Sequence, residues 1–125
     1  MDDLFVEATD ITPMVDFSKH RNTFKIVGKS LPEDVKSFYT PIIQWFDIYL
    51  SQPNPETNLI LDFEYFNTSS SKMILILLNK VREISRKGLP VLVTWSYPPH
   101  DVEIEEAGEE FAELLNIPFQ FVAKD

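Results

Sequence analysis

The sequence predicts one α/β domain over residues 1–125, with a mixed, mostly parallel sheet of about five strands, an N-terminal β-hairpin and about three helices. A chain of 125 residues suits one domain, and 44% hydrophobic residues, including ten Phe, are sufficient for a core. After the hairpin, short β-branched runs alternate with longer segments of helical spacing, and no linker interrupts them. Such strand–helix–strand repeats indicate right-handed crossovers onto a parallel sheet, in either a two-layer or a nearly doubly wound arrangement.

The hairpin is expected from the N-terminal segment. Residues 4–8 have the composition of a short strand, and residues 14–17 are expected to continue it after a break at Pro13. Residues 23–29 alternate apolar and polar side chains, which is typical of a second strand. The polar residues 18–22 predict the turn between the two strands.

The first helix is expected to follow directly. Ser30 is a candidate N-cap, and Pro32 suits a first helical turn. Apolar side chains then recur with helical spacing from Val35 to Tyr49. Because Pro41 falls within this pattern, the sequence predicts either a kink or a restart of the helix there.

Strands and helices continue to alternate in the rest of the chain. We expect strands over residues 58–66, 91–95 and 119–122. We expect helices between them, over residues 68–87 and 102–115. The run 91–95 is apolar and β-branched, which is typical of a central strand. The last segment is expected to close the sheet as an edge strand.

The composition argues against several classes of function. The formal net charge is −9, and such a surface repels nucleic acids and anionic membranes, which are bound chiefly through Lys and Arg. Without cysteine the chain forms no disulfides, thiolate metal sites or cysteine nucleophile. The N-terminus is acidic where a secretory signal is basic, and the longest apolar run, residues 73–78, is too short to span a bilayer. We therefore expect a cytoplasmic protein with protein partners, no nucleic acid and no membrane insertion.

The most informative segment is the strand-to-helix turn at residues 65–72, Tyr-Phe-Asn-Thr-Ser-Ser-Ser-Lys. Its four consecutive hydroxyl residues, 68–71, stand where the first N–H groups of a helix lack acceptors. One hydroxyl suffices as a cap, and a cap contributes ~1 kcal/mol. The turn is therefore either a capping turn with redundant hydroxyls or a site for an anion or a phosphorylation, because a phosphate there meets the positive end of a helix. The residues alone leave both interpretations open.

Several stretches of the chain occur in the order in which a known family has them. They cover residues 28–33, 38–39, 65–72, 93–95 and 106–113, together with Pro41 and Trp45. Through these stretches the sequence resembles the SiaC family of bacterial regulatory phosphoproteins over nearly its whole length. The Tyr-Phe-Asn-Thr-Ser-Ser turn is the most specific of them.

The resemblance implies a fold similar to the anti-sigma-factor antagonist (STAS) domains and a partner-switching role without enzymatic activity or a cofactor. It further implies that a dedicated protein kinase phosphorylates Thr68 and that a PP2C-like phosphatase reverses this. By the same resemblance, the unphosphorylated form is expected to bind and activate a diguanylate cyclase, which would link the switch to cyclic-di-GMP signalling and biofilm formation. Partner contacts are expected from Asn67, Ser69, Ser70, Lys72, Glu106, Glu109 and Glu110.

The acidic segment 101–113 allows three interpretations. Its glutamates share a helical face, so they are either a solvated surface, a docking surface for a basic partner, or ligands of a divalent metal. The last of these would support a small metal-dependent hydrolase, as would the carboxylate pair Asp62 and Glu64 on one strand. The sequence offers no activated nucleophile for such an enzyme. A constitutive interaction module in which Thr68 is merely a helix cap is the remaining alternative.

The other notable side chains are expected to have structural or surface roles. His20 and His100 are expected in exposed loops. Trp45 and Trp95 are expected in the core. Leu75 lies in an apolar run too continuous for one helical stripe, so we expect it to be exposed at an interface.

Overall fold

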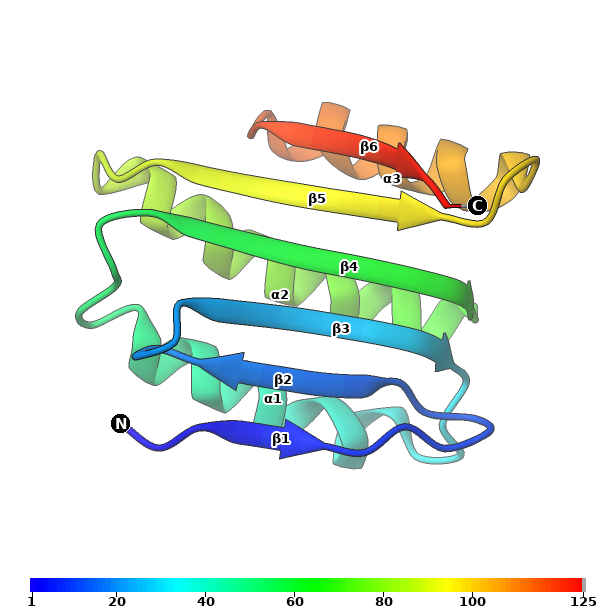
Figure 1. The fold of residues 1–125 in the computed structure, drawn as a ribbon, viewed down its shortest axis with the longest axis horizontal. Helices are drawn as coiled ribbons and strands as arrows, with labels where there is room; N and C mark the ends of the chain where they lie inside the picture. Colours follow the sequence, from blue (N-terminus) through cyan, green and yellow to red (C-terminus); the bar gives the residue numbers. More distant parts are fainter. Residues whose placement is uncertain (125) are drawn as a thin grey trace.

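A computed structural model describes residues 1–124, in which six strands form one sheet and three helices lie along it (Figure 1). The strands are β1 (Leu4–Val6), β2 (Met14–Ser18), β3 (Thr23–Ser30), β4 (Thr57–Phe66), β5 (Val91–Tyr97) and β6 (Phe119–Ala123). The helices are α1 (Val35–Tyr49), α2 (Thr68–Arg86) and α3 (Val102–Leu115). Asp125, the last residue of the expected domain, lies outside the described residues.

The N-terminal segment contains one strand more than expected. Residues 14–17 do not continue the first strand but form β2, which pairs antiparallel with β1. The chain reverses because the Thr9 side chain closes a turn, in which its Oγ1 accepts the N–H groups of Ile11 at 3.2 Å and Thr12 at 2.9 Å. The hairpin predicted next, between β2 and β3, is confirmed as an antiparallel pair.

The remaining strands run parallel, as predicted, and the sheet order is β1-β2-β3-β4-β5-β6. Each crossover therefore moves to the next strand in the same direction, and right-handed crossovers of this kind place every helix on one face. Figure 1 shows α1, α2 and α3 behind the sheet. The arrangement is thus two-layered rather than doubly wound, and within residues 1–124 no helix covers the other face.

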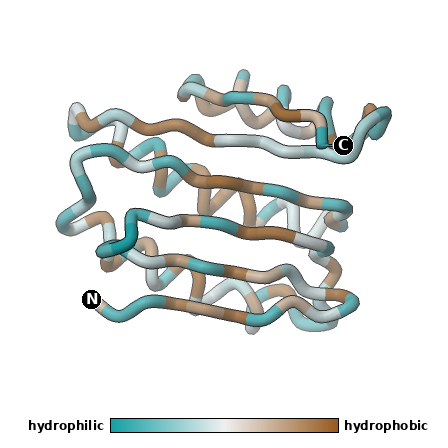
Figure 2. Tube along the Cα trace, viewed as in Figure 1, coloured by the Kyte–Doolittle hydropathy of each residue, from teal (hydrophilic) through white to brown (hydrophobic). Residues whose placement is uncertain are grey.

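The core fills the space between the sheet and the helices. In Figure 2, hydrophobic and hydrophilic residues alternate along the strands, as expected for a sheet with one buried face. Trp45 and Trp95 are buried, with 8% and 0% of their surface exposed, which confirms their expected place in the core. Leu75 is half-buried against the core, so its expected exposure is wrong, and its neighbour Ile76 is 42% exposed instead.

Helix α1 begins later than expected and is not restarted. Asp34 is its N-cap, because Asp34 Oδ1 accepts the Ser37 N–H at 3.1 Å. Pro41 lies inside one continuous helix, on its exposed side. Ser30, expected as the cap, instead ends β3 and is completely buried.

Helix α3 packs closely on β5 through Gly108. A Cβ atom on Gly108 would lie 2.5 Å from Nε1 of the Trp95 indole, so no larger residue fits without a shift. The indole N–H of Trp95 also donates to the Ile104 carbonyl at 3.0 Å. Together these contacts fix α3 over the β5–β6 side of the sheet.

Candidate functional site: the turn between β4 and α2

The turn of interest joins β4, in the middle of the sheet, to the central helix α2. Asn67 is the N-cap of α2, since its Oδ1 accepts the Ser70 N–H at 2.9 Å. The Asn67 N–H donates to the Ser30 carbonyl at 3.1 Å, which ties the turn to the end of β3. Thr68 is the first residue of the helix and not its cap. The interpretation of Thr68 as merely a helix cap is therefore wrong, because the asparagine already has that role.

The four hydroxyl residues occupy different environments. Thr68 and Ser69 are exposed, Ser71 is half-buried, and Ser70 is 0% exposed. The expectation that Ser70 contacts a partner is thus contradicted, because its hydroxyl faces the interior. On this turn, Thr68 and Ser69 are the hydroxyls most open to modification from solution.

Beneath the turn lies a buried hydroxyl network formed by Ser30, Tyr39 and Ser70. Ser70 Oγ donates to the Ser30 carbonyl at 2.9 Å and accepts from Ser30 Oγ at 2.8 Å. The Tyr39 hydroxyl lies 2.6 Å from Ser30 Oγ and is the donor, since the Ser30 proton is already committed to Ser70. The network joins α1, β3 and α2, and so holds the first turn of α2 in place.

Burial keeps the phenol of Tyr39 neutral. Burial raises the pKa of Tyr39 to about 12, while the nearby hydroxyls of Ser30 and Ser70 act in the opposite direction. Every hydroxyl of the network has a partner, as buried polar groups require. A fully satisfied network of this kind favours one fixed conformation of the turn above it.

The surface of the turn favours a negatively charged group. The N–H groups of Thr68 and Ser69 have no acceptor within residues 1–124, and the first turn of α2 contains no acidic residue. Lys72 is exposed one helical turn after Thr68 and forms no ion pair with the described residues. A phosphate on Thr68 would therefore meet free donors, the positive end of the helix dipole and a nearby cation.

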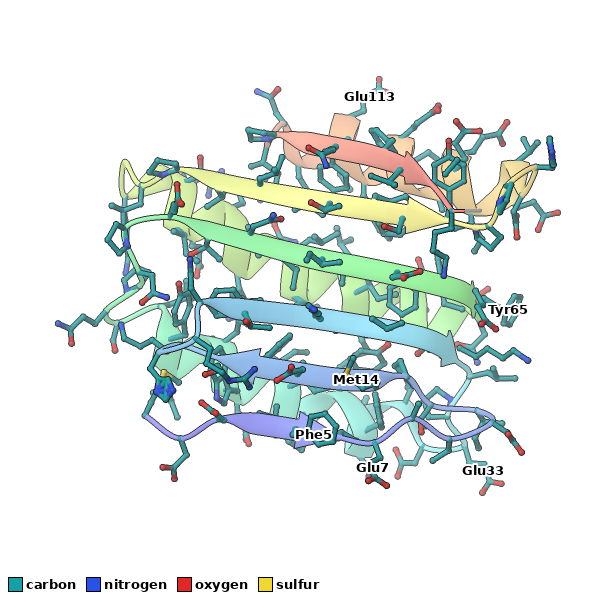
Figure 3. All side chains as sticks on the ribbon, viewed as in Figure 1. Phe5, Glu7, Met14, Glu33, Tyr65 and Glu113 are labelled. Atoms are coloured by element: carbon teal, nitrogen blue, oxygen red, sulfur yellow. The ribbon has the colours of Figure 1, made fainter. Side chains whose placement is uncertain are left out.

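Two exposed apolar side chains lie near this polar turn. Tyr65, at the end of β4, is 50% exposed and extends past the end of the strand (Figure 3). Ile76 is exposed two turns along α2 from Thr68. Sequence reasoning missed both of them as surface residues. The usable signal for Tyr65 was its place just before a predicted helix start, and for Ile76 it was the apolar run 73–78, which is too continuous for one buried stripe.

The other residues expected to contact partners fall into two places. Asn67, Ser69 and Lys72 lie on the turn itself, with Asn67 half-buried and the other two exposed. Glu106, Glu109 and Glu110 are exposed on α3, which covers a different part of the sheet. The glutamates of α3 are therefore not part of the surface of the turn.

The arrangement gives little support to the alternative of a metal-dependent hydrolase. Asp62 Oδ1 forms an ion pair with Lys124 at 2.6 Å, whereas Glu64 is exposed. Among residues 1–124, no three His, Asp or Glu side chains are grouped so that they could hold a metal ion.

His20 and His100 are exposed in loops, as expected. No helix of the described residues is long and apolar enough to cross a membrane.

Comparisons with known proteins agree with the fold and with the family that the sequence resembles. The sequence profile of the SiaC family of regulatory phosphoproteins matches residues 6–124. An uncharacterized protein of Pseudomonas aeruginosa strain UCBPP-PA14 is 30% identical over 125 residues, which covers 100% of this chain and 99% of that protein.

Two solved structures from Pseudomonas aeruginosa resemble the whole chain. The crystal structure of apo-SiaC matches with a TM-score of 0.87 at 28% identity, over 98% of this chain and 100% of SiaC. SiaC in the crystal structure with the diguanylate cyclase SiaD, which it activates, matches with a TM-score of 0.91 at 29% identity, over the same shares. The profile match spans nearly the whole sequence, and the chain belongs to the SiaC family of regulatory phosphoproteins.

Proposed function

We propose that this protein is a non-enzymatic cytoplasmic regulator that is switched by reversible phosphorylation of Thr68. Its unphosphorylated form binds and activates a diguanylate cyclase, and so controls cyclic-di-GMP signalling and biofilm formation. The environment of Thr68 supports this most. Its hydroxyl is exposed at the first position of α2, next to free N–H groups and above the buried hydroxyl network. Membership of a family of regulatory phosphoproteins points the same way.

Two further proteins complete the proposed switch. A protein kinase transfers a phosphoryl group to Thr68, and a PP2C-like phosphatase removes it. The kinase needs access to the Thr68 hydroxyl and the phosphatase to its phosphate ester, and the Asn67 cap leaves the Thr68 side chain free for both. Because Asn67 and Ser70 hold the turn from below, addition and removal of the phosphate leave the fold intact.

The phosphate would act on docking through charge and desolvation. The cyclase is proposed to contact the exposed side chains around Thr68, which include Tyr65, Ser69, Lys72 and Ile76. A phosphothreonine adds ~1.5–2 negative charges at neutral pH, to a protein whose formal net charge is already −9. Burying such a group in a contact without a matching cation costs several kcal/mol, and ~3 kcal/mol already weakens binding by more than a hundredfold.

Phosphorylation is tested by intact mass after incubation with the cognate kinase. The wild-type protein is expected to gain one phosphate, Thr68→Ala none, and Ser69→Ala, the matched exposed hydroxyl, one. Peptide mapping then assigns the site. Modification of another residue with Thr68 unmodified would overturn the proposal.

Docking is tested separately with a diguanylate cyclase from the same organism. Thr68→Ala is expected to bind and activate it as the wild type does, whereas stoichiometrically phosphorylated protein is expected to do neither. Equal binding by both forms would refute an electrostatic switch, even if Thr68 is the phosphorylated residue.

A further inference from the structure

Among residues 1–124, no strand pairs with the outer edge of β6, the last strand of the sheet. The Pro118 carbonyl accepts the Val93 N–H at 3.0 Å, and the Lys124 N–H donates to the Tyr97 carbonyl at 2.9 Å. Backbone groups alternate in direction along a strand, so the even-numbered residues of β6 face β5. The N–H and C=O groups that face outward belong to Phe119, Phe121 and Ala123.

The two edges of the sheet differ in how they are protected. The β1 edge is three residues long, and carboxylates flank it at Asp2, Asp3 and Glu7. Short length and charge are the common means by which proteins block an edge strand from pairing with another chain. β6 is longer, with five uncharged residues, Phe-Gln-Phe-Val-Ala, of which Phe121 and Val122 are 38% and 37% exposed. The one charged side chain that flanks it among the described residues, Lys124, is paired with Asp62. The edge at β6 is thus open to strand addition where the edge at β1 is not.

The helix beside β6 supplies a strong negative charge. α3 contains six glutamates and no Lys or Arg. Glu110 and Glu113 line a shallow depression on it with Leu114, whose side chain is 63% exposed. Figure 3 shows Glu113 extending outward from α3 past the β6 edge. Any segment that pairs with β6 therefore lies next to an acidic helix.

This charge distinguishes between possible occupants of the edge. A second copy that paired edge to edge would bring two α3 helices together, and twelve glutamates without a single cation on either helix would repel each other. A segment with Lys or Arg on either side of its pairing residues would instead be attracted. The charges thus favour a cationic partner over a second copy of this chain.

We propose that the free edge of β6 is a docking site for an extended cationic segment of a protein partner, which adds as a further strand and places its basic side chains against the glutamates of α3. Main-chain hydrogen bonds from Phe119, Phe121 and Ala123 hold the segment, and the flanking charges select it. The site goes beyond the proposed switch and does not depend on Thr68, which lies on a different strand connection.

The proposal is tested with the full chain and a labelled synthetic peptide of alternating Val and Thr, flanked at each end by two lysines. Fluorescence anisotropy is expected to show saturable binding. Ala123→Pro removes one outward N–H and leaves the N–H groups that bond to β5, so it is expected to weaken binding about tenfold, as for one lost hydrogen bond. Ala123→Val retains the N–H and is the matched control, with affinity close to that of the wild type.

Two peptide variants keep the test valid if Ala123→Pro affects folding. A peptide with N-methyl groups on all of its Val and Thr residues cannot donate hydrogen bonds along either edge and is expected not to bind the wild-type protein. A peptide with Glu in place of Lys is expected not to bind either, and the double variant Glu110→Gln/Glu113→Gln is expected to weaken binding and reduce its salt dependence. Thr68→Ala is expected to retain the wild-type affinity.

Three outcomes would overturn the proposal. The first is the absence of saturable binding. The second is equal binding of the N-methylated peptide, which would indicate a purely electrostatic contact. The third is a dimer in sedimentation experiments without peptide that Ala123→Pro dissociates, because a second copy would then occupy the edge.

Discussion

Replacing Ser70 by alanine is expected to destabilise the protein far more than the same change at its neighbour Ser69. Ser70 Oγ makes two buried hydrogen bonds to Ser30, at 2.8 and 2.9 Å, and the side chain is 0% exposed. In Ser70→Ala the Ser30 hydroxyl loses its acceptor, while the Ser30 carbonyl keeps the Asn67 N–H at 3.1 Å. One lost hydrogen bond and one poorly satisfied buried hydroxyl together correspond to ~2–3 kcal/mol of unfolding free energy.

The measurement is equilibrium unfolding in urea, followed by tryptophan fluorescence. Ser70→Ala is expected to lower the midpoint without a change in the m-value, and in a thermal scan to lower Tm by ~10 °C. Ser69→Ala, at an exposed position, is expected to stay within ~0.5 kcal/mol of the wild type.

A double-mutant cycle tests whether the hydroxyls act as one network. Tyr39→Phe removes the donor to Ser30 Oγ and is expected to cost ~1–2 kcal/mol on its own. Because Tyr39 and Ser70 share Ser30 as a partner, the double variant is expected to depart from additivity by ~1 kcal/mol. Additive effects, or a Ser70→Ala variant as stable as Ser69→Ala, would refute the network as the support of the turn.

Three further changes have defined outcomes. Asn67→Ala is expected to lower the free energy of unfolding in urea by ~1 kcal/mol, because the cap of α2 is lost. Asn67→Asp can also accept the Ser70 N–H and should retain most of this stability. Equal losses in the two variants would contradict the capping role. Gly108→Ala places a Cβ 2.5 Å from the Trp95 indole and is expected to lower the free energy of thermal unfolding by ~1–3 kcal/mol. The near-UV circular dichroism of Trp95 should change as well. A neutral effect would show that α3 moves freely on β5. The raised pKa of Tyr39, about 12 against 10.0 in the unfolded chain, gives stability that is complete below pH 10.0 and is lost as the pH rises toward 12. Tyr39→Phe should therefore show a weaker loss of stability over that range than the wild type, and parallel curves would contradict the burial of this phenol.

The order of elements and the place of the turn could be predicted because they depend on local patterns. Helical spacing marked residues 35–49, and the hydroxyl run marked the start of α2. The extra strand was missed because residues 8–13 contain no Gly or Asn to indicate a reversal, and the Thr9 side chain closes that turn instead. A pattern of apolar residues does not distinguish an interrupted strand from two antiparallel ones.

The division of roles among the hydroxyls could not be predicted from local sequence. Three identical serines follow Thr68, and only the rotation of α2 against the sheet decides that Ser70 faces inward. The other members of its network, Ser30 and Tyr39, are distant in sequence and lie on another strand and another helix. The cap was also ambiguous, because asparagine and threonine are both good N-caps, and the structure assigns that role to Asn67.

The proposed switch depends on the effect of one phosphate on one contact. Its most direct test is a calorimetric titration of a diguanylate cyclase from the same organism with this protein, either unmodified or stoichiometrically phosphorylated at Thr68. We expect saturable binding of the unmodified form and an affinity at least a hundredfold lower for the phosphorylated form, as for a loss of ~3 kcal/mol. Equal affinities of the two forms would refute the switch.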